Sequence, residues 1–204
     1  TGLDISADMV EAARSTAPGG EFVVADAVTW AAPDAAFDVV LSRFGVMFFD
    51  DPQRAFTNLA RATAPGGRLA VATWAARPAS SMFDVPLYAA LAIVDAPAPP
   101  PDQGPFSLHH PGLLADLLTA SGWWRPSTTV HDLDLLLGGG LTPEEAAPGC
   151  VDLGPTRVVT EGVDEGTRRR VVDAVTEALR DHVDADGHVV LAGRVLVTTA
   201  QRGE

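Results

Sequence analysis

The sequence has very few of the residues on which covalent, metal and redox sites are commonly built. Its 204 residues include one cysteine and one tyrosine, and all 14 basic residues are arginine, which excludes lysine chemistry. The single cysteine, Cys150, can form neither an internal disulfide nor a cysteine-based metal cluster, and we interpret it as an inert thiol in a reducing compartment. We therefore expect a cytoplasmic protein with no metal site.

Positive charge is scarce as well. The chain carries 27 acidic against 14 basic residues, a net charge of -13. Such a surface repels phosphate backbones and anionic lipid, so we expect neither nucleic acid nor a membrane as partner, whereas a cationic small ligand is favoured. No apolar run approaches the roughly 18 residues of a membrane span. With 47% hydrophobic residues, the chain can build one globular domain with a core on both sides of a sheet.

Proline and glycine divide the first third of the chain into alternating strands and helices. A short apolar run ends at Asp4, and three further unbroken apolar runs indicate strands covered on both faces. These three runs span residues 22–25, 37–41 and 69–74. Ser6 and Asp51 are placed to cap two helices, which Pro18-Gly19-Gly20 and Pro65-Gly66-Gly67 end. The order strand, helix, strand, strand, helix, strand predicts a doubly wound α/β sheet with a ligand edge at the carboxyl ends of the strands.

Beyond residue 75 the pattern becomes more helical and richer in loops. The expected helices span residues 81–94, 113–120 and 168–183, and the expected strands span 128–137 and 194–200. A Pro-rich stretch at 96–105 is expected to be an extended loop that covers the site. The glycine run at 138–140 precedes a capped helix start at Thr142, but we interpret it as a loop rather than a phosphate-binding turn.

Four motifs, in order along the chain, carry a resemblance to a known family. They are Leu3-Asp4-Ile5-Ser6, Ala25-Asp26-Ala27, Phe37-Asp38-Val39-Val40-Leu41-Ser42 and Ala64-Pro65-Gly66-Gly67-Arg68-Leu69. Each is unspecific alone, but in this order and spacing they resemble the class I S-adenosylmethionine-dependent methyltransferases. The resemblance implies a Rossmann-like sheet, S-adenosyl-L-methionine as the cofactor and methyl transfer to a small-molecule acceptor. It also suggests three parts within one domain: a cofactor-binding part (1–75), a helical cap with the Pro-rich loop (76–112), and a carboxy-terminal part of the sheet with helices (113–204).

The resemblance further implies which residues face the cofactor. A carboxylate at the end of the second strand of such a fold accepts hydrogen bonds from ribose hydroxyls, and this role falls to Asp4, with Ile5 against the adenine face. Asp26 and the backbone of Ala27 would meet the adenine amino edge. Structural roles stay open for these positions, as a helix-start carboxylate, a loop aspartate and a core isoleucine. The remaining cofactor-facing candidates are Ser42 and Arg43.

Methyl transfer from a sulfonium makes modest demands on side chains. The leaving group is a neutral thioether, so no general acid is needed and much of the acceleration can come from alignment of the reacting atoms. An acceptor that must lose a proton still needs a base, for which His109 and His110 are candidates. Surface histidines and core aromatics are the structural alternatives. The candidates for the acceptor pocket are Phe48, Phe83 and Tyr88.

One part of the family pattern is missing from the sequence. The first strand and its glycine-rich turn are expected about 20 residues before Asp4. Because the chain also begins without Met, we interpret it as amino-terminally truncated, and expect the complete protein to be a methyltransferase and the 204-residue piece alone to be inactive. Two other classes stay open. A nicotinamide-dependent reductase would also use Asp4, but the Tyr-x-x-x-Lys pair of short-chain reductases is excluded here; a non-catalytic methyltransferase-like binding domain fits the same motifs.

Overall fold

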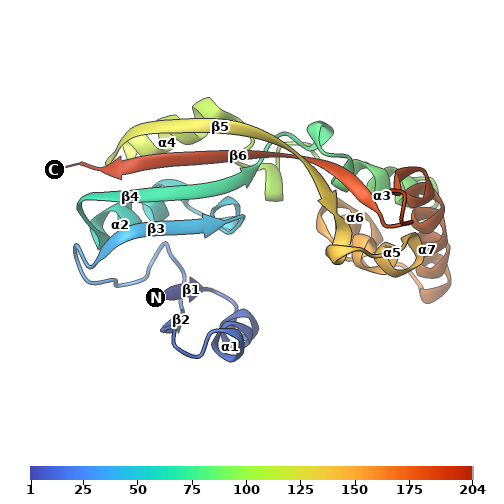
Figure 1. Ribbon diagram of the computed structural model, residues 1–204, viewed down its shortest axis with the longest axis horizontal. Coiled ribbons are helices and arrows are strands. Elements are labelled where there is room, and N and C mark those ends of the chain that lie inside the picture. The colour runs from blue at the N-terminus through green and yellow to red at the C-terminus, as the bar shows by residue number, and fades with distance from the viewer. Residues whose placement is uncertain (204) are drawn as a thin grey trace. The chain divides into compact units, whose positions relative to one another are not determined.

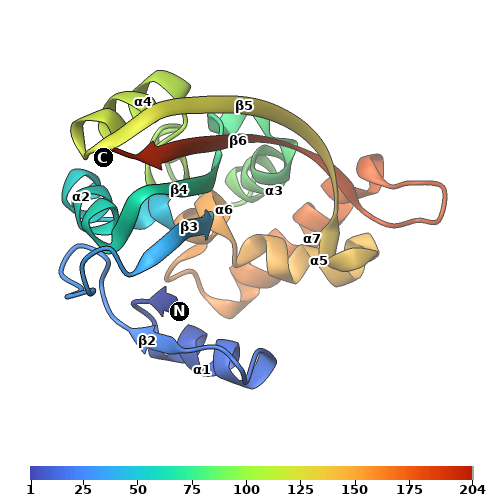
Figure 2. The same cartoon turned by 60° about the vertical axis from the view of Figure 1, so that its left-hand side comes forward.

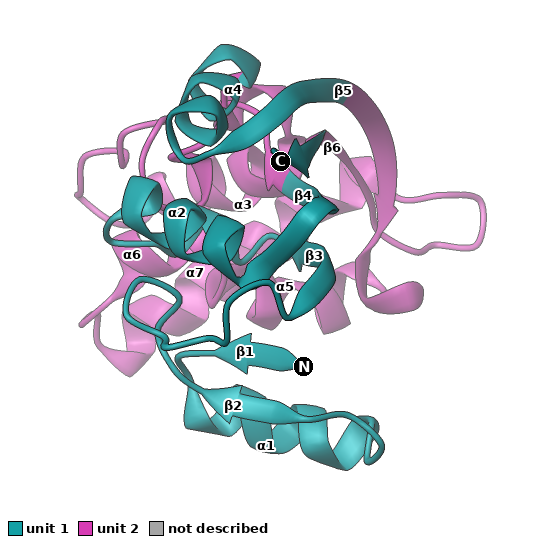
Figure 3. Ribbon diagram, turned by 90° about the vertical axis from the view of Figure 1, so that its left-hand side faces the viewer, with its two compact units in different colours: residues 1–72, 111–129, 197–204 teal, residues 73–110, 130–196 magenta. Residues whose placement is uncertain are grey.

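A computed structural model describes residues 1–203 of the protein, which fall into two compact units (Figure 3). The first unit comprises Thr1–Ala72, Pro111–Thr129 and the chain from Val197 onwards, and the second comprises Thr73–His110 and Val130–Leu196. Three of the four boundaries between the units fall inside strands, and the fourth lies just before Pro111. The expected division into residues 1–75, 76–112 and 113–204 stays a prediction. No helix among the described residues is long and apolar enough to cross a membrane.

The amino-terminal elements follow the predicted order. They are β1 (Gly2–Asp4), α1 (Ala7–Thr16), β2 (Phe22–Val24), β3 (Phe37–Arg43), α2 (Pro52–Ala62) and β4 (Thr63–Trp74). Both predicted helix caps are confirmed: the Ser6 side chain accepts a hydrogen bond from the N–H of Met9, and the Asp51 carboxylate accepts one from the N–H of Arg54. Both β1 with β2 and β3 with β4 pair in parallel.

The Pro65-Gly66-Gly67 segment does not end α2, contrary to expectation. The helix ends at Ala62, and the segment lies inside β4 as an irregularity, so that Phe37 pairs with Thr63 but Val39 pairs with Arg68. Gly66 has a φ of +76°, and a Cβ on Gly67 would lie 2.9 Å from the carbonyl oxygen of Asp38. The two glycines therefore let β4 bulge while its backbone stays close to β3.

The strands form two separate sheets among the described residues. One holds β1 and β2, and the other has the order β3-β4-β6-β5 (Figure 3). The expectation that the apolar runs are covered on both faces comes nearest to the structure in β4, where Leu69 and Val71 on one face are each 1% exposed and Ala70 and Ala72 on the other face are half-buried. It is wrong for β3, where Val39 is 52% and Leu41 74% exposed. The physical reason is that β3 lies at the edge of its sheet and that the side chains of Val39 and Leu41, which share one face, line an open cavity.

The sheet is mixed rather than wholly parallel. Strands β5 (Trp123–Leu136) and β6 (Val190–Arg202) pair so that Thr128 bonds Thr198 while Asp132 bonds Arg194, which is an antiparallel register. Figure 1 shows β6 running opposite to both β4 and β5. The predicted α/β architecture is thus confirmed in its coarse form, with one strand reversed.

A helical layer packs on the strands of the first unit. Helix α4 (Pro111–Ala120) lies beside α2 (Figure 2). Trp123, at the start of β5, is 1% exposed and donates its indole N–H to the carbonyl oxygen of Phe56, which is fully buried in α2 (3.0 Å). Trp123 therefore ties the start of β5 to α2, whereas the neighbouring Trp124 is 63% exposed.

The second unit is largely helical. Its α-helices are α3 (Ser81–Leu91), α5 (Pro143–Val151), α6 (Gly154–Thr160) and α7 (Glu165–Leu179). Short 3-10 turns occur over the whole chain at Val46–Phe48, Arg77–Ala79, Gly104–Phe106, Leu137–Gly139 and Arg180–His182. The predicted cap of α5 is confirmed, because Thr142 and Glu145 form a capping box. Hydrogen bonds from the backbone N–H groups of Ala192 and Arg194 to the hydroxyls of Ser81 and Ser80 hold the start of α3 to β6.

Candidate functional site

A cavity of about 640 Å³ opens in the first unit along β1 and β3. Its volume lies within the range of about 300–1,000 Å³ typical of small-molecule sites. All of its lining residues fall between positions 1 and 62, and they include the carboxyl ends of β1 and β3 and the loop that follows β2. The structure thereby brings together seven predicted site residues. They are Asp4, Ile5, Asp26, Ala27, Ser42, Arg43 and Phe48.

Asp4 is the last residue of β1 and is fixed by its own loop. Its Oδ1 accepts a hydrogen bond from the backbone N–H of Ser6 (2.8 Å), and its carbonyl oxygen accepts one from Ala25 (3.0 Å). The first bond fixes the carboxylate to the start of α1, and the second holds the end of β1 against the residue after β2. The side chain is exposed, and none of the described residues donates to its Oδ2. One carboxylate oxygen is thus anchored while the other stays available to a ligand in the cavity.

Asp26 is held in the same manner two residues after β2. Its Oδ1 accepts from the N–H of Val28 (2.8 Å), and its carbonyl oxygen accepts from Thr29 and Trp30, which makes the loop a single tight turn. Asn58 of α2 holds this turn from the other side, because its Nδ2 donates to the carbonyl oxygens of Ala27 (2.9 Å) and Trp30 (2.7 Å). Sequence reasoning missed Asn58. The available signal was a polar residue next to Leu59 and Ala60 on the apolar stripe of a helix.

The end of β3 contributes backbone strain as well as side chains. Phe44 has a φ of +64°, a left-handed conformation that costs a residue with a Cβ roughly 1–2 kcal/mol, between Arg43 and Gly45 of the cavity lining. Ile5 and Phe48 expose 73% and 62% of their surface. Large apolar side chains that are this exposed in a cavity are available for contact with an apolar or aromatic ligand.

Comparison with known proteins agrees with this geometry. Residues 1–71, which contain every residue of the cavity lining, match the methyltransferase domain family. Residues 1–71, about a third of the chain, are thus similar to methyltransferase domains and contain all four predicted motifs. The predicted resemblance of the four motifs is therefore confirmed, and so is homology to methyltransferases that use S-adenosylmethionine.

Individual relatives match over the same segment. The demethylmenaquinone methyltransferase of Renibacterium salmoninarum is 34% identical over 70 residues, which is 34% of this chain and 30% of that protein. The trans-aconitate 2-methyltransferase of Paracidovorax citrulli is 38% identical over 72 residues, or 35% and 28% of the two chains. The aligned segment thus spans less than a third of either relative. The YcgJ protein of Bacillus subtilis shares the fold, with a TM-score of 0.56 at 16% identity over 100% of this chain and 82% of that one.

The predicted acceptor and base residues outside the methyltransferase domain lie in the second unit. Phe83 is 4% exposed and packs edge-on against Trp74 and Phe106, with ring centroids 5.0 Å away in both cases. Tyr88 is 56% exposed on α3. His109 Nδ1 lies 2.8 Å from the carbonyl oxygen of Phe106, and the ring of His110 lies beside that of His109. The structure does not bring these four residues into the lining of the cavity, so their roles stay predictions.

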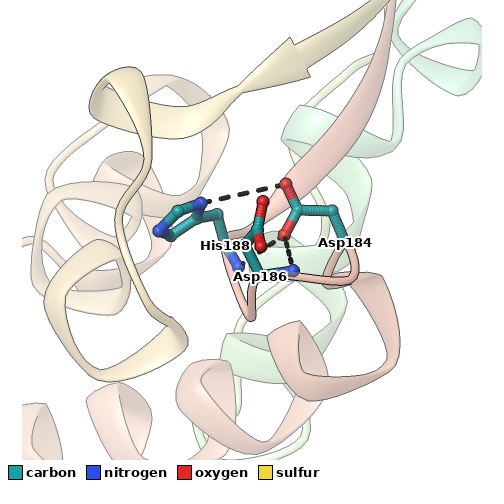
Figure 4. A group of neighbouring side chains, drawn as sticks. All are labelled: Asp184, Asp186 and His188. Carbon is teal, nitrogen blue, oxygen red and sulfur yellow. Dashed lines mark hydrogen bonds and ion pairs between the residues drawn. The ribbon is translucent and has the colours of Figure 1, made fainter.

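One cluster outside the domain has the composition of a cation site. Asp184, Asp186 and His188 project from the hairpin between Val183 and Val189, and their ligand atoms lie within 4.8 Å of one another (Figure 4). The Oδ1 atom of Asp184 accepts from the backbone N–H groups of Asp186 and His188, both at 2.9 Å. The bond from His188 is the main reason that the pKa of Asp184 is lowered. These bonds explain the arrangement as a hairpin turn, and we assign it no metal.

The charges in the cavity favour a cationic ligand. The lining contains three carboxylates, Asp4, Asp26 and Asp50, and one cation, Arg43. The field of such a lining attracts a small cation and repels a phosphate. A sulfonium is a cation, so the charge of the cavity fits S-adenosylmethionine, and the carboxylates at two strand ends are acceptors for hydroxyl and amino groups.

Proposed function

We propose that this protein binds S-adenosylmethionine in the cavity of the first unit and transfers its methyl group to a small-molecule acceptor. The observation that carries the proposal is the placement of Asp4 and Asp26. They follow two adjacent parallel strands, line one cavity, and each anchors one carboxylate oxygen to its own loop. The methyltransferase family of residues 1–71 supports the same assignment.

Each predicted residue of the cavity would contact a different part of the cofactor. Asp4 accepts the ribose hydroxyls through its Oδ2, and Asp26 accepts from the adenine amino group, because an ionised carboxylate makes stronger hydrogen bonds than a neutral acceptor. Ile5 supplies an apolar surface for the adenine ring. Ser42 and Arg43 close the site at the end of β3, where Phe48 offers a ring face to the acceptor or to the sulfonium.

The proposed methyl transfer depends mainly on alignment of the reacting atoms. When bound, S-adenosylmethionine would supply a methyl group on a sulfonium: the lone pair of the acceptor would form a bond to the methyl carbon, and the electrons of the broken carbon–sulfur bond would stay on the departing neutral thioether. The rigid anchoring of Asp4 and Asp26 contributes by holding the nucleoside in one position. An acceptor oxygen or nitrogen must also lose a proton, and His109 and His110 are the proposed bases. Named relatives that act on demethylmenaquinone and trans-aconitate support a small-molecule acceptor.

We also propose that a further strand completes the sheet between β1 and β3. Two observations support it: β1 and β3 do not pair with each other, and the apolar side chains of Val39 and Leu41 face the cavity largely exposed. Backbone N–H and C=O groups along an unpaired edge form hydrogen bonds readily with an added strand. In the family, this position is held by a strand followed by a glycine-rich turn, and we propose that sequence before Thr1 in the gene encodes both.

Calorimetric titration with S-adenosylhomocysteine tests the binding function. The protein should be produced with whatever sequence precedes Thr1 in the gene. Asp4→Ala should weaken binding by about 1.5–3 kcal/mol for each charged hydrogen bond lost. Asp8→Ala is the matched control, since Asp8 is an exposed carboxylate in the first turn of α1 and does not line the cavity. Equal affinities of the two variants would assign Asp4 to the turn before α1 and remove the ribose role.

A second candidate is a methyltransferase-like domain that binds a ligand without catalysis. The observation that favours it is the position of Phe83, which packs in an aromatic core instead of lining the cavity. Incubation with S-adenosylmethionine labelled on the methyl group, and with extracts of small metabolites, separates the two candidates. Transfer of label supports the enzyme, and tight cofactor binding with no transfer over a broad set of acceptors supports the binding domain.

A further inference from the structure

A half-buried amide on α2 connects that helix to the loop after β2. Asn58 Nδ2 donates to the carbonyl oxygens of Ala27 (2.9 Å) and Trp30 (2.7 Å), which precede it by 31 and 28 residues. Its Oδ1 accepts from Nη2 of Arg61 (2.9 Å). Only the nitrogen of the amide can donate to two carbonyl groups, and only the oxygen can accept from arginine, so the orientation of the side chain is chemically determined.

These bonds hold both ends of the turn that carries Asp26. Inside the turn, the carbonyl oxygen of Asp26 accepts from Thr29 and Trp30, and its Oδ1 accepts from Val28. Outside the turn, Asn58 fixes the two carbonyl groups that point toward α2. The same turn also faces the cavity, because Asp26, Ala27 and Trp30 line it. The position of the second oxygen of Asp26 therefore depends on the Asn58 amide.

We infer that Asn58 is a positioning residue that sets a preference for a 6-aminopurine over a 6-oxopurine in the proposed cofactor site. The inference rests on the function proposed above. A 6-amino group donates to the carboxylate of Asp26, whereas a 6-oxo group presents a second acceptor and is repelled by it. A polar site discriminates between such ligands only while its groups stay fixed, because a mobile carboxylate turns away from the mismatched partner. Asn58 supplies that rigidity without touching the ligand.

The test compares three variants in the protein that includes any sequence before Thr1. Asn58→Asp keeps the size of the side chain and the acceptor for Arg61 but removes both N–H donors. Asn58→Ala removes the donors without adding a charge, and serves if the first variant unfolds. The matched control is Thr57→Ala, because Thr57 is the exposed neighbour on the same helix and its hydroxyl bonds only within α2, to Gln53.

Two measurements are made on each variant. Amide hydrogen exchange without ligand reports the turn itself, and the N–H groups of Thr29 and Trp30 should exchange about tenfold faster in both Asn58 variants than in Thr57→Ala. Calorimetry with S-adenosylhomocysteine and S-inosylhomocysteine reports selectivity. The ratio of the two affinities should fall about tenfold in the Asn58 variants, through loss of the adenosyl ligand, and stay unchanged in the control.

The outcomes are distinct. Faster exchange with an unchanged affinity ratio would show that Asn58 only stabilises the loop, and would overturn the inference. Unchanged exchange would show that Asn58 does not hold the turn, and would overturn it as well. If the unmodified protein binds neither ligand, the proposed function fails and the selectivity role fails with it, while the exchange data still decide whether the amide holds the turn.

Discussion

The open edge of β3 gives a quantitative prediction about the strand proposed to complete the sheet. Leu41 and Val39 on β3 are 74% and 52% exposed, and Ile5 and Phe48 in the same cavity are 73% and 62% exposed. Full burial of one such side chain is worth about 1.5–3 kcal/mol, so these four represent about 4–8 kcal/mol of burial that the described residues do not provide. That is comparable with the entire stability of many domains, about 5–15 kcal/mol.

Leu41→Lys tests this reasoning when it is made in two proteins, residues 1–204 alone and the product that includes the sequence before Thr1. In the shorter protein Leu41 is already exposed, so the change in the free energy of unfolding should stay within about 0.5 kcal/mol, and a charge on an open edge should reduce association. In the longer protein the side chain would be covered, and the lysine should cost about 3 kcal/mol or more. Urea unfolding and size-exclusion chromatography measure both effects.

Leu69→Lys is the matched control. Leu69 lies on the neighbouring strand β4 at 1% exposure, so its replacement should be strongly destabilising in both proteins. A small effect of Leu41→Lys in both proteins would show that no strand covers β3. The unmodified 204-residue chain should itself associate and fail to transfer methyl groups. A monomeric chain that melts cooperatively and methylates would refute the proposal directly.

Two further predictions concern backbone fit and the single thiol. Gly67→Ala should destabilise the protein by about 1–3 kcal/mol, because the added Cβ would lie 2.8 and 2.9 Å from the carbonyl oxygens of Ala64 and Asp38. Gly149→Ala in α5, where the added Cβ meets open space, should stabilise it by about 0.5–1 kcal/mol. Thermal melts in which Gly149→Ala is no more stable than Gly67→Ala would contradict this reasoning. Burial raises the pKa of Cys150 to about 11. The thiol of the folded protein therefore stays protonated to a higher pH than that of the unfolded chain, so the free energy of unfolding should fall as the pH rises from about 9 toward 11. Alkylation of Cys150 in the folded protein near pH 8 at the rate of a free thiol would contradict its burial.

Much of the fold follows from signals that are local in sequence. The caps at Ser6 and Asp51 depend on residues within the next few positions, and Pro and Gly separate the apolar runs, so the element order of the first 74 residues could be predicted. Tertiary context decided the rest. Pro65-Gly66-Gly67 has the composition of a helix stop, but pairing with β3 turned it into a bulge within β4. The direction of β6 depends on its neighbours in the sheet and has no signature of its own in Val190–Arg202.

The same distinction between local signals and tertiary context applies to the candidate site. The placement of Asp4 and Asp26 at one edge could be predicted, because each directly follows an apolar run and the ends of parallel strands meet there, whereas their contacts with a cofactor come from the family resemblance and stay predictions. Phe83 could not be separated from a pocket residue, since an apolar stripe on a helix predicts burial but does not say against what. Asn58 had no local partner at all, because its two acceptors lie 31 and 28 residues earlier.

Asn58 illustrates how a helix that packs on a sheet can also position a loop of the candidate site. Ala55, Phe56 and Leu59 bury the apolar stripe of α2, and this fixes the helix against the strands. Once the helix is fixed, a short polar side chain at the margin of that stripe can reach only the loop that the helix covers. An amide left there without partners would cost about 1–3 kcal/mol, so its two donors must find acceptors in that loop. A polar residue within the buried stripe of such a helix therefore indicates which loop the helix supports. For Asn58 of α2, that loop is the one that carries Asp26.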